Sequence, residues 1–268
     1  VEMGDREGDV NVSADARITL AFLEPDIENS ISTLEEVIDI SHANNLLKPA
    51  GRAHLNLGYF QNEYLIDLAA SRNHALLAAE LNIETGDHWA TIPYSNAIEN
   101  ILIVGTIDKA QQLFNRKFMV PSEQGSLQEY YTRVNRARIL SARGEWQAVF
   151  KIIRELIQED RLQESIQRMG TRNIELALVS LELNRFGLLE DLSEAESGLR
   201  ENLEMDHRTI QSHYLLSTVY TRQGRLSQAH DLVAQPMEDR TFNGRENNRL
   251  VASRAMAEAE IAMAEKRW

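Results

Sequence analysis

Three glycines recur along the chain at a spacing of about 40 residues or twice that distance. Gly105, Gly144 and Gly224 each stand four or five residues before an alanine, between segments whose apolar residues repeat every three or four positions. Glycine can end a helix in the left-handed conformation, and a small alanine lets the next helix pack closely. The same step predicts a further turn near Asn184, because asparagine also tolerates that conformation. The spacing therefore predicts a repeated helix-turn-helix unit.

The same period predicts the remaining turns and the breaks between units. Turns are expected near residues 24–26, 62–63 and 265–267. Breaks between units are expected where residues typical of helix ends gather, at 49–51, 85–87, 121–123 and 240–244. The chain then holds about six and a half helical hairpins.

The composition favours a helical fold. The chain of 268 residues has 5 prolines, 13 glycines and 6% aromatic residues, so residues typical of turns and β-strands are few. A helical hairpin cannot bury both of its apolar faces alone, whereas a stack of hairpins shares one continuous core. We therefore expect an all-α protein, an α-solenoid that forms a right-handed superhelix. Residues 1–12 are expected to be disordered or extended, and residues 13–268 to form a single superhelical domain cut from a longer protein.

The hairpin between residues 214 and 229 resembles a tetratricopeptide repeat (TPR). The residues at the signature positions of that family are Leu216, Ser217, Tyr220, Gly224 and Ala229. A second hairpin is similar and contains Tyr94, Ile101, Gly105, Ala110 and Phe114. The period is longer than the family's usual spacing of about 34 residues. With endings such as residues 78–87, it resembles the helical sensor region of maltose-regulon-type transcriptional activators and related signalling NTPases.

Sequence motifs for catalysis or cofactor binding are absent: there is no His-Glu-x-x-His, no phosphate-binding glycine loop, no Gly-x-Ser-x-Gly and no calcium loop. Cysteine is absent as well, which excludes a thiolate zinc site and a cysteine nucleophile. The seven histidines are scattered singly, and His207 and His213 have the wrong helical spacing to share a metal. We therefore expect a protein that is not an enzyme and holds no metal and no cofactor.

The charge and hydropathy of the chain exclude other classes of partner. A formal net charge of −13 would repel a phosphate backbone, so we expect no nucleic-acid binding through this segment. No window approaches eighteen uninterrupted apolar residues, so no membrane contact is expected. The lack of cysteine is compatible with the reducing cytoplasm, which is the expected location.

The family resemblance also implies which residues contact a ligand. In tetratricopeptide repeats the first helix of each hairpin lines a concave groove, and matching the turn glycines transfers the groove positions to this chain. In addition, Asn96 and Asn135 each stand nine residues before a turn glycine, where an asparagine can bond both N–H and C=O of an extended peptide. The alternative is that both are only polar positions on a helix that face water or a neighbouring helix. The candidate partner-binding residues are Ser95, Asn96, Glu99, Tyr131, Asn135, Arg138, Gln211, Tyr214 and Thr218.

These observations predict a non-catalytic interaction module that binds a protein or peptide, or another domain of the same chain, in its groove. The alternative is a ligand- or peptide-sensing regulatory domain of a multidomain signalling protein or transcriptional regulator. If the chain ends in the middle of a hairpin, its last helix exposes an apolar face with Val251, Ala255 and Ala262, and self-association is expected there. The sequence identifies neither the partner, the attached effector domain nor the oligomeric state.

Overall fold

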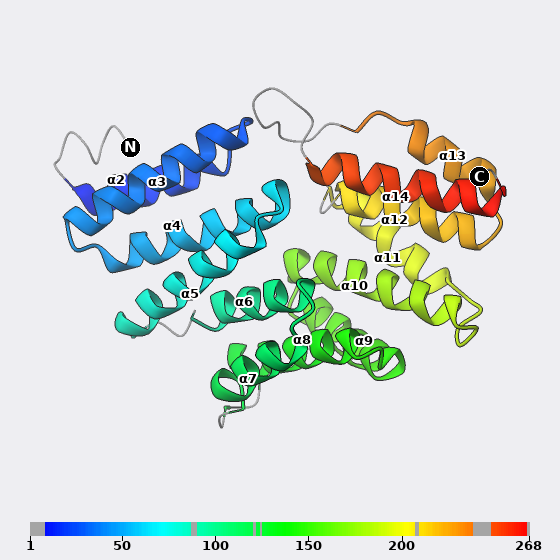
Figure 1. Ribbon diagram of the computed structural model, residues 1–268, viewed down its shortest axis with the longest axis horizontal. Coiled ribbons are helices and arrows are strands. Elements are labelled where there is room, and N and C mark those ends of the chain that lie inside the picture. Colours follow the sequence, from blue (N-terminus) through cyan, green and yellow to red (C-terminus); the bar gives the residue numbers. More distant parts are fainter. Residues whose placement is uncertain are drawn as a thin grey trace. The chain divides into compact units, whose positions relative to one another are not determined.

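The computed structural model of the chain describes residues 9–86, 90–119, 122–123, 125–206, 209–237 and 248–266, and only the backbone of residues 248 and 249. In these ranges the regular structure is entirely helical: thirteen α-helices, one five-residue π-helix and no strand (Figure 1). The predicted all-α class is thereby confirmed for this part of the chain. Each of the described helices is too short or too polar to cross a membrane.

The chain divides into two compact units, and the division falls within helix α8. The first unit contains α2 (Val10–Ala21), α3 (Ile27–Ala43), α4 (Leu47–Phe60), the π-helix η1 (Gln61–Leu65), α5 (Leu68–Glu84), α6 (Thr91–Ile103), α7 (Ile107–Lys117) and α8 (Leu127–Ala142) as far as Asn135. The second unit contains the rest of α8, α9 (Trp146–Leu162), α10 (Ile166–Arg185), α11 (Ser193–Glu204), α12 (Thr209–Arg222), α13 (Leu226–Ala234) and α14 (Asn248–Ala264) from Leu250. The expectation of one domain over residues 13–268 stays a prediction.

Residues in the left-handed conformation punctuate the helices at regular intervals. Those that separate the two helices of a hairpin are Ile66, Gly105, Gly144, Gly187 and Gly224. Those that separate one hairpin from the next are Asn45, Gly86, Gly125, Glu164 and Asp206. Both series recur about every 40 residues, so the predicted period is present in the backbone itself. The first helices of the hairpins are α2, α4, α6, α8, α10 and α12.

The three turn glycines adopt the predicted left-handed conformation, with φ of 78° at Gly105, 76° at Gly144 and 73° at Gly224. The turn predicted near Asn184 is present, but its left-handed residue is Gly187, with a φ of 68°, three residues after Asn184. Asn184 lies within α10, and its Nδ2 donates a hydrogen bond of 3.0 Å to the carbonyl oxygen of Leu189 beyond the turn.

Two other boundaries lie a few residues from their predicted places. The turn expected at residues 62–63 occurs at Ile66, because η1 continues α4 by one more turn. The break expected at residues 49–51 occurs at Asn45, because α4 begins at Leu47. Pro49 lies in the first turn of α4, where a helix has no use for its missing N–H.

The turn expected at residues 24–26 agrees with the gap between α2 and α3, and residues 265 and 266 follow the end of α14, whereas residue 267 lies outside the described residues. The breaks expected at 85–87 and 121–123 fall between described helices, although residues 87 and 121 themselves lie outside the described residues. So do residues 1–8 and 240–244. Helix α2 begins at Val10, with the Asp9 carboxylate accepting a hydrogen bond from the amide of Val12 at 3.1 Å. Residues 10–12 are therefore helical, which corrects the expectation of an extended segment up to residue 12.

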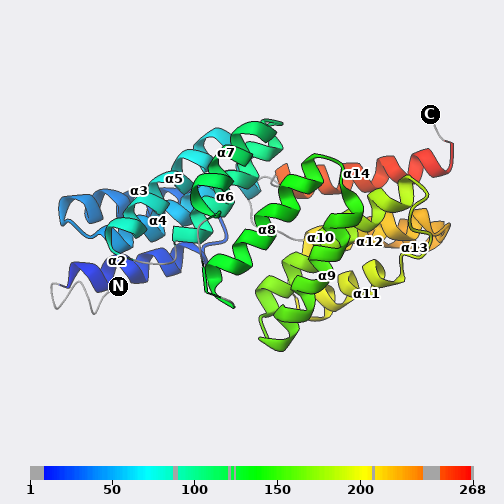
Figure 2. The same cartoon turned by 90° about the horizontal axis from the view of Figure 1, so that it is seen from below.

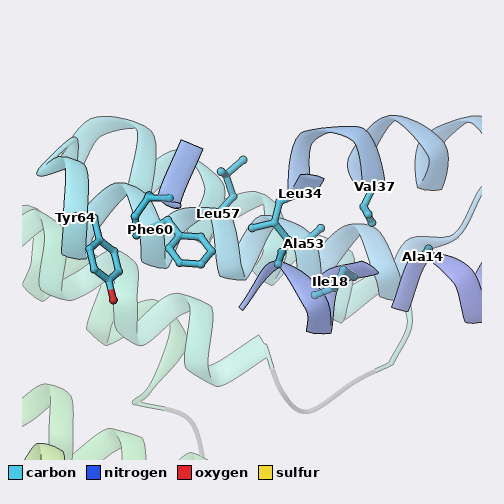
Figure 3. Close-up of a cluster of buried hydrophobic side chains, with 10 residues drawn as sticks. Ala14, Ile18, Leu34, Val37, Ala53, Leu57, Phe60 and Tyr64 are labelled. Atoms are coloured by element: carbon cyan, nitrogen blue, oxygen red, sulfur yellow. The ribbon is translucent and has the colours of Figure 1, made fainter. Parts of the chain in front are cut away.

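The core of the first unit forms where α2, α3 and α4 meet. The enclosed side chains labelled in Figure 3 are Ala14, Ile18, Leu34, Val37, Ala53, Leu57, Phe60 and Tyr64. All except Tyr64, which lies in η1 directly after α4, come from these three helices, and they form one buried cluster. None of the three helices therefore buries its apolar face without the other two. Full burial of each large aliphatic or aromatic side chain contributes about 1.5–3 kcal/mol.

In the second unit α14 lies along α12 and α13 (Figures 1 and 2). Its Ile261 joins the cluster around Val219 and Tyr220, and its Leu250 packs near Tyr214. The opposite face of α14 is more open, since Val251 is 43% exposed and Ala255 is also exposed, whereas Ala262 is half-buried. The predicted self-association through this face stays a prediction.

Polar contacts link equivalent positions of successive hairpins within each unit. In the first unit Ser95 of α6 bonds Asn135 of α8, 40 residues later. In the second unit Arg154 and Arg161 of α9 bond Glu194 and Glu201 of α11, each also 40 residues later. Helices two steps apart also pack together, α2 with α4 and α10 with α12. These contacts are consistent with a stack of successive hairpins within each unit.

The backbones of α4 and α5, the two helices of one hairpin, come close together at Gly58. Gly58 of α4 lies against Ser71 of α5, so that a Cβ on Gly58 would stand 3.1 Å from the Ser71 carbonyl oxygen. The Ser71 hydroxyl donates a hydrogen bond of 2.7 Å to the Gly58 carbonyl and accepts one of 2.7 Å from Asn100 of α6. One buried serine thus ties three helices together.

We expect Gly58→Ala to lower the free energy of unfolding by about 1–3 kcal/mol, because a methyl group would force two backbones apart. Gly51→Ala is the matched control on the same helix. Its Cβ would stand 2.9 Å from the side-chain oxygen of Asn82, which can rotate away, and its other neighbours, at 3.4 Å or more, are at ordinary contact distance. At Gly51 the higher helix propensity of alanine, worth about 1 kcal/mol, should offset the cost of moving the Asn82 side chain. Urea unfolding followed by circular dichroism measures both, and equal effects would contradict the close approach.

Candidate functional site

The structure divides the candidate residues predicted from the family resemblance into two groups. The enclosed ones are Ser95, Asn135 and Tyr214, with exposed fractions of 0%, 0% and 3%. The half-buried ones are Asn96, Glu99, Tyr131, Arg138, Gln211 and Thr218. The enclosed group is not open to a partner, which corrects the prediction for those three residues.

Asn135 holds two first helices together. Its Oδ1 accepts a hydrogen bond of 3.0 Å from the Ser95 hydroxyl of α6, and its Nδ2 donates one of 2.8 Å to the Tyr131 carbonyl on its own helix. The amide is therefore used inside the protein on both sides. The hypothesis that Asn135 grips a peptide backbone is wrong, and the alternative that it faces a neighbouring helix is correct.

Tyr214 and Thr218 also make their contacts within the protein. Tyr214 packs in the cluster where Leu250 and Ala257 of α14 meet Ile210 of α12. The Thr218 hydroxyl donates a hydrogen bond of 3.2 Å to the Tyr214 carbonyl, one turn earlier on the same helix. The helix face that was predicted to present Tyr214 to a ligand therefore packs against α14.

Arg138 faces the next first helix. Its Nε lies 3.8 Å from Oε1 of Glu175 on α10, and Glu175 also pairs with the buried Arg172. The Arg138 side chain is only 18% exposed, and its guanidinium bridges α8 and α10. The roles of Asn96, Glu99 and Gln211 stay predictions.

A cavity of about 670 Å³ lies in the first unit, along the first helices α2 and α4. Pockets for ligands typically measure about 300–1,000 Å³, so this one can hold a small molecule or a few residues of a peptide. It is lined by Asn11, Val12, Asp15 and Ala16 of α2, Lys48, Pro49, Arg52 and Leu55 of α4, and Asn82 of α5. These helices are seen together in Figure 1.

Two cations on one face of α4 give the cavity its polar character. Arg52 pairs with Asp15 and donates a hydrogen bond of 3.0 Å to the Thr19 hydroxyl, so its guanidinium is fixed in direction. Lys48, one turn earlier, is exposed and has no ion-pair partner in the described part of the chain. The amides of Asn11 and Asn82 can both donate and accept hydrogen bonds. The lining therefore suits a carboxylate next to a peptide backbone.

This cavity lies outside the predicted groove, because the groove positions were transferred from turn glycines. The first two hairpins have no glycine between their helices: the left-handed residue of the second is Ile66, and no left-handed residue separates α2 from α3. A usable signal was nonetheless present. Lys48 and Arg52 stand four residues apart, which places two cations on one face of a helix.

Three of the seven histidines, which looked scattered in the sequence, lie together in the first unit. His42 of α3, His54 of α4 and His74 of α5 come from three successive helices. The Nδ1 atoms of His54 and His74 are 3.0 Å apart, and the two rings stack with centroids 5.2 Å apart. The His42 ring lies 6.1 Å from that of His54, between centroids. Among the described residues, no group of three or more His, Asp or Glu side chains is arranged to hold a metal ion.

Burial keeps this histidine pair neutral. His54 is 6% exposed, and burial followed by the neighbouring His74 and His42 lowers its pKa from 6.5 to about 4. Burial also lowers the pKa of His74, although the carboxylates of Glu35 and Asp67 partly oppose the change. At neutral pH one imidazole therefore donates the hydrogen bond between the Nδ1 atoms and the other accepts it.

We expect Asn135→Ala to lower the free energy of unfolding by about 1–3 kcal/mol, because it leaves the Ser95 hydroxyl and the Tyr131 carbonyl without this buried partner. Asn96→Ala, at the matching position before its own turn glycine, should stay within about 0.5 kcal/mol of the parent, since Asn96 is half-buried. Chemical denaturation of both variants decides the point. A loss of stability confined to Asn96→Ala would reverse the assignment.

The stability of the protein should fall as the pH drops from 6.5 to 4. In that window the unfolded chain binds a proton at His54, whereas the folded chain does not until about pH 4. Between pH 7 and pH 5 this costs about 2 kcal/mol of unfolding free energy. His54→Gln should remove that part of the slope in urea titrations at the two pH values. His230→Gln, at an exposed pair with Glu265 in the second unit, should retain it.

Comparison with known proteins identifies no related protein. A search against protein-family models finds no match, and a search of the curated proteins finds none either. The function of the chain therefore has to come from its stacked hairpins, its cavity and its charged groups.

Proposed function

We propose that this chain is a tetratricopeptide-like α-solenoid that binds a segment of polypeptide along its first helices and catalyses no reaction. The period of about 40 residues in the left-handed turns supports a repeat protein. The bonds between positions 40 residues apart support regular stacking within each unit. Stacked hairpins commonly use the surface of one helix layer to bind extended partners.

The observation that carries this proposal is the cavity lined by α2 and α4. An extended peptide offers its backbone amides to Asn11 and Asn82 and an acidic side chain or terminal carboxylate to Lys48 and Arg52. Apolar side chains of the same peptide find Val12, Ala16, Pro49 and Leu55 on the cavity wall. The proposed partner is therefore a protein, or another domain of the same chain, that presents a segment with mixed acidic and apolar character.

The make-up of the cavity also supports a binding role over catalysis. Of the described lining residues, the ionisable ones are Asp15, Lys48 and Arg52, and Asp15 is held by Arg52. General acid–base chemistry requires two groups tuned to different pKa values near the operating pH. In this cavity Asp15 is paired with Arg52, and Lys48 is exposed to water. Such groups are suited to binding a charged ligand.

The alternative proposal is a regulatory domain that senses a small ligand or a peptide. The volume of the cavity favours it, because about 670 Å³ is also typical of small-molecule sites. In that case occupation of the cavity would change how α2, α4 and α5 pack and so act on an attached domain. Both proposals use the same lining residues and differ in the size of the ligand.

We expect Lys48→Glu to weaken peptide binding by about tenfold or more, equivalent to about 1.4 kcal/mol. The probe is a displayed library of random peptides of about 12 residues, selected on the full chain. Fluorescence polarisation then gives the Kd of the enriched peptides. The charge reversal should cost affinity because it places a carboxylate where the peptide carboxylate binds, while Lys48 is exposed and contributes little to folding.

Lys109→Glu on α7 is the matched control, because it makes the same charge change at an exposed position of the same unit, outside the cavity. Its Kd should stay within about twofold of the parent value. Equal weakening by both variants would point to net charge and not to the cavity. A selection that enriches no peptide would overturn the binding of a polypeptide segment.

A further inference from the structure

The hydrogen bond between His54 and His74 connects α4 and α5, two helices that both contribute residues to the cavity wall. We propose that this histidine pair is a pH-sensitive latch: it holds α5 against α4 when neutral, releases it when both rings are protonated, and so regulates the cavity along α2 and α4. The latch itself depends only on the contacts of the first unit. Its effect on a bound segment rests on the proposed function.

Because of its geometry, the hydrogen bond between His54 and His74 can form only in certain protonation states. A hydrogen bond between two Nδ1 atoms 3.0 Å apart needs one N–H and one free lone pair. One proton on the pair is tolerated at an outward Nε2, whereas two protonated rings would direct two N–H groups at each other. His54 is nearly enclosed and cannot turn to water, so the second proton requires the helices to move apart.

The surrounding charges set the order of protonation. His42 of α3 disfavours a proton on His54, whereas Glu35 of α3 and Asp67 before α5 favour one on His74. The other elements packed against α4 and α5 are α2, η1 and α6, and their charged residues are Asp15, Arg17, Glu63 and Glu99. Of these, Asp15 pairs with Arg52 and Arg17 with Glu36. The first proton therefore goes to the half-exposed His74, and the second, on His54, opens the latch.

Opening at this position acts directly on the cavity. His54 lies between Arg52 and Leu55 on α4, and both of these residues line the cavity. Asn82, further along α5 from His74, lines it from the other side and lies close to Gly51 of α4. The bond from the Ser71 hydroxyl to the Gly58 carbonyl is not titratable and remains. Helix α5 therefore pivots about this fixed contact, which moves Asn82 relative to the cation-bearing face of α4.

The first experiment measures opening without any ligand. Hydrogen exchange of the full chain, corrected for the intrinsic effect of pH, should rise about tenfold or more in α4 and α5 between pH 7 and pH 4.5, and much less in α9 and α10. The double variant His54→Gln, His74→Gln keeps an amide hydrogen bond that does not titrate, so its exchange in α4 and α5 should be flat. The single variant His74→Gln on the half-exposed partner serves if the double variant does not fold. Wild-type protection that does not change with pH would overturn the latch.

The second experiment follows the cavity itself. The chain has no cysteine, so spin labels can be placed at Asn11→Cys on α2 and Glu80→Cys on α5, both exposed positions. Electron–electron distance measurements should show a shifted and broader distribution at pH 4.5 than at pH 7, and the shift should disappear in the double glutamine background. An unchanged distribution would overturn the link between latch and cavity. Because neither readout needs a partner, a peptide selection that fails would reject the proposed function and leave the latch standing.

Discussion

The structure depends on the fact that no single hairpin of this chain can cover its own apolar faces. Leu34 of α3, Leu57 of α4 and Ile18 of α2 are enclosed only because three helices meet, and Ile261 of α14 completes the cluster on α12 and α13 in the same way. Cohesion in a stack of hairpins comes from neighbouring units, and its contributions add along the chain. A site on such a protein therefore inherits its geometry from how closely two successive hairpins approach.

Buried hydrogen bonds set that approach and its register. Ser95 bonds Asn135 across two first helices in the first unit, and in the second Asn202 of α11 accepts from Asn173 and donates to Ser212 at 3.0 Å each. Apolar packing alone would tolerate a slip of one helix along another, whereas an unpaired buried amide costs about 1–3 kcal/mol. Asn135, Asn173 and Asn202 hold neighbouring helices in register, so the asparagine at position 135, predicted to bind a ligand, is part of the packing instead.

The sequence predicts the helices and their period because both depend on local chemistry. Gly105, Gly144 and Gly224 occupy a backbone conformation that glycine adopts more readily than other residues do, so their spacing indicates the turns. The site does not follow from the same signals, since it depends on which faces meet after stacking. His42, His54 and His74 show no period in the sequence, and only the packing of three helices brings their rings together. Tyr214 fits a groove position by register, yet the added helix α14 covers it.

The charge of the chain constrains how the cavity can work. With a net charge of −13, the protein repels an acidic segment at long range, and Lys48 and Arg52 reverse this only within about one Debye length, or 8–10 Å. Association with such a segment gains little from electrostatic steering, so selectivity has to come from short-range contacts inside the cavity. Those contacts require Asn82 of α5 and the cations of α4 at a fixed separation. The close approach of α4 and α5 at Gly58, which stabilises the fold, is therefore also what gives the cavity a defined shape.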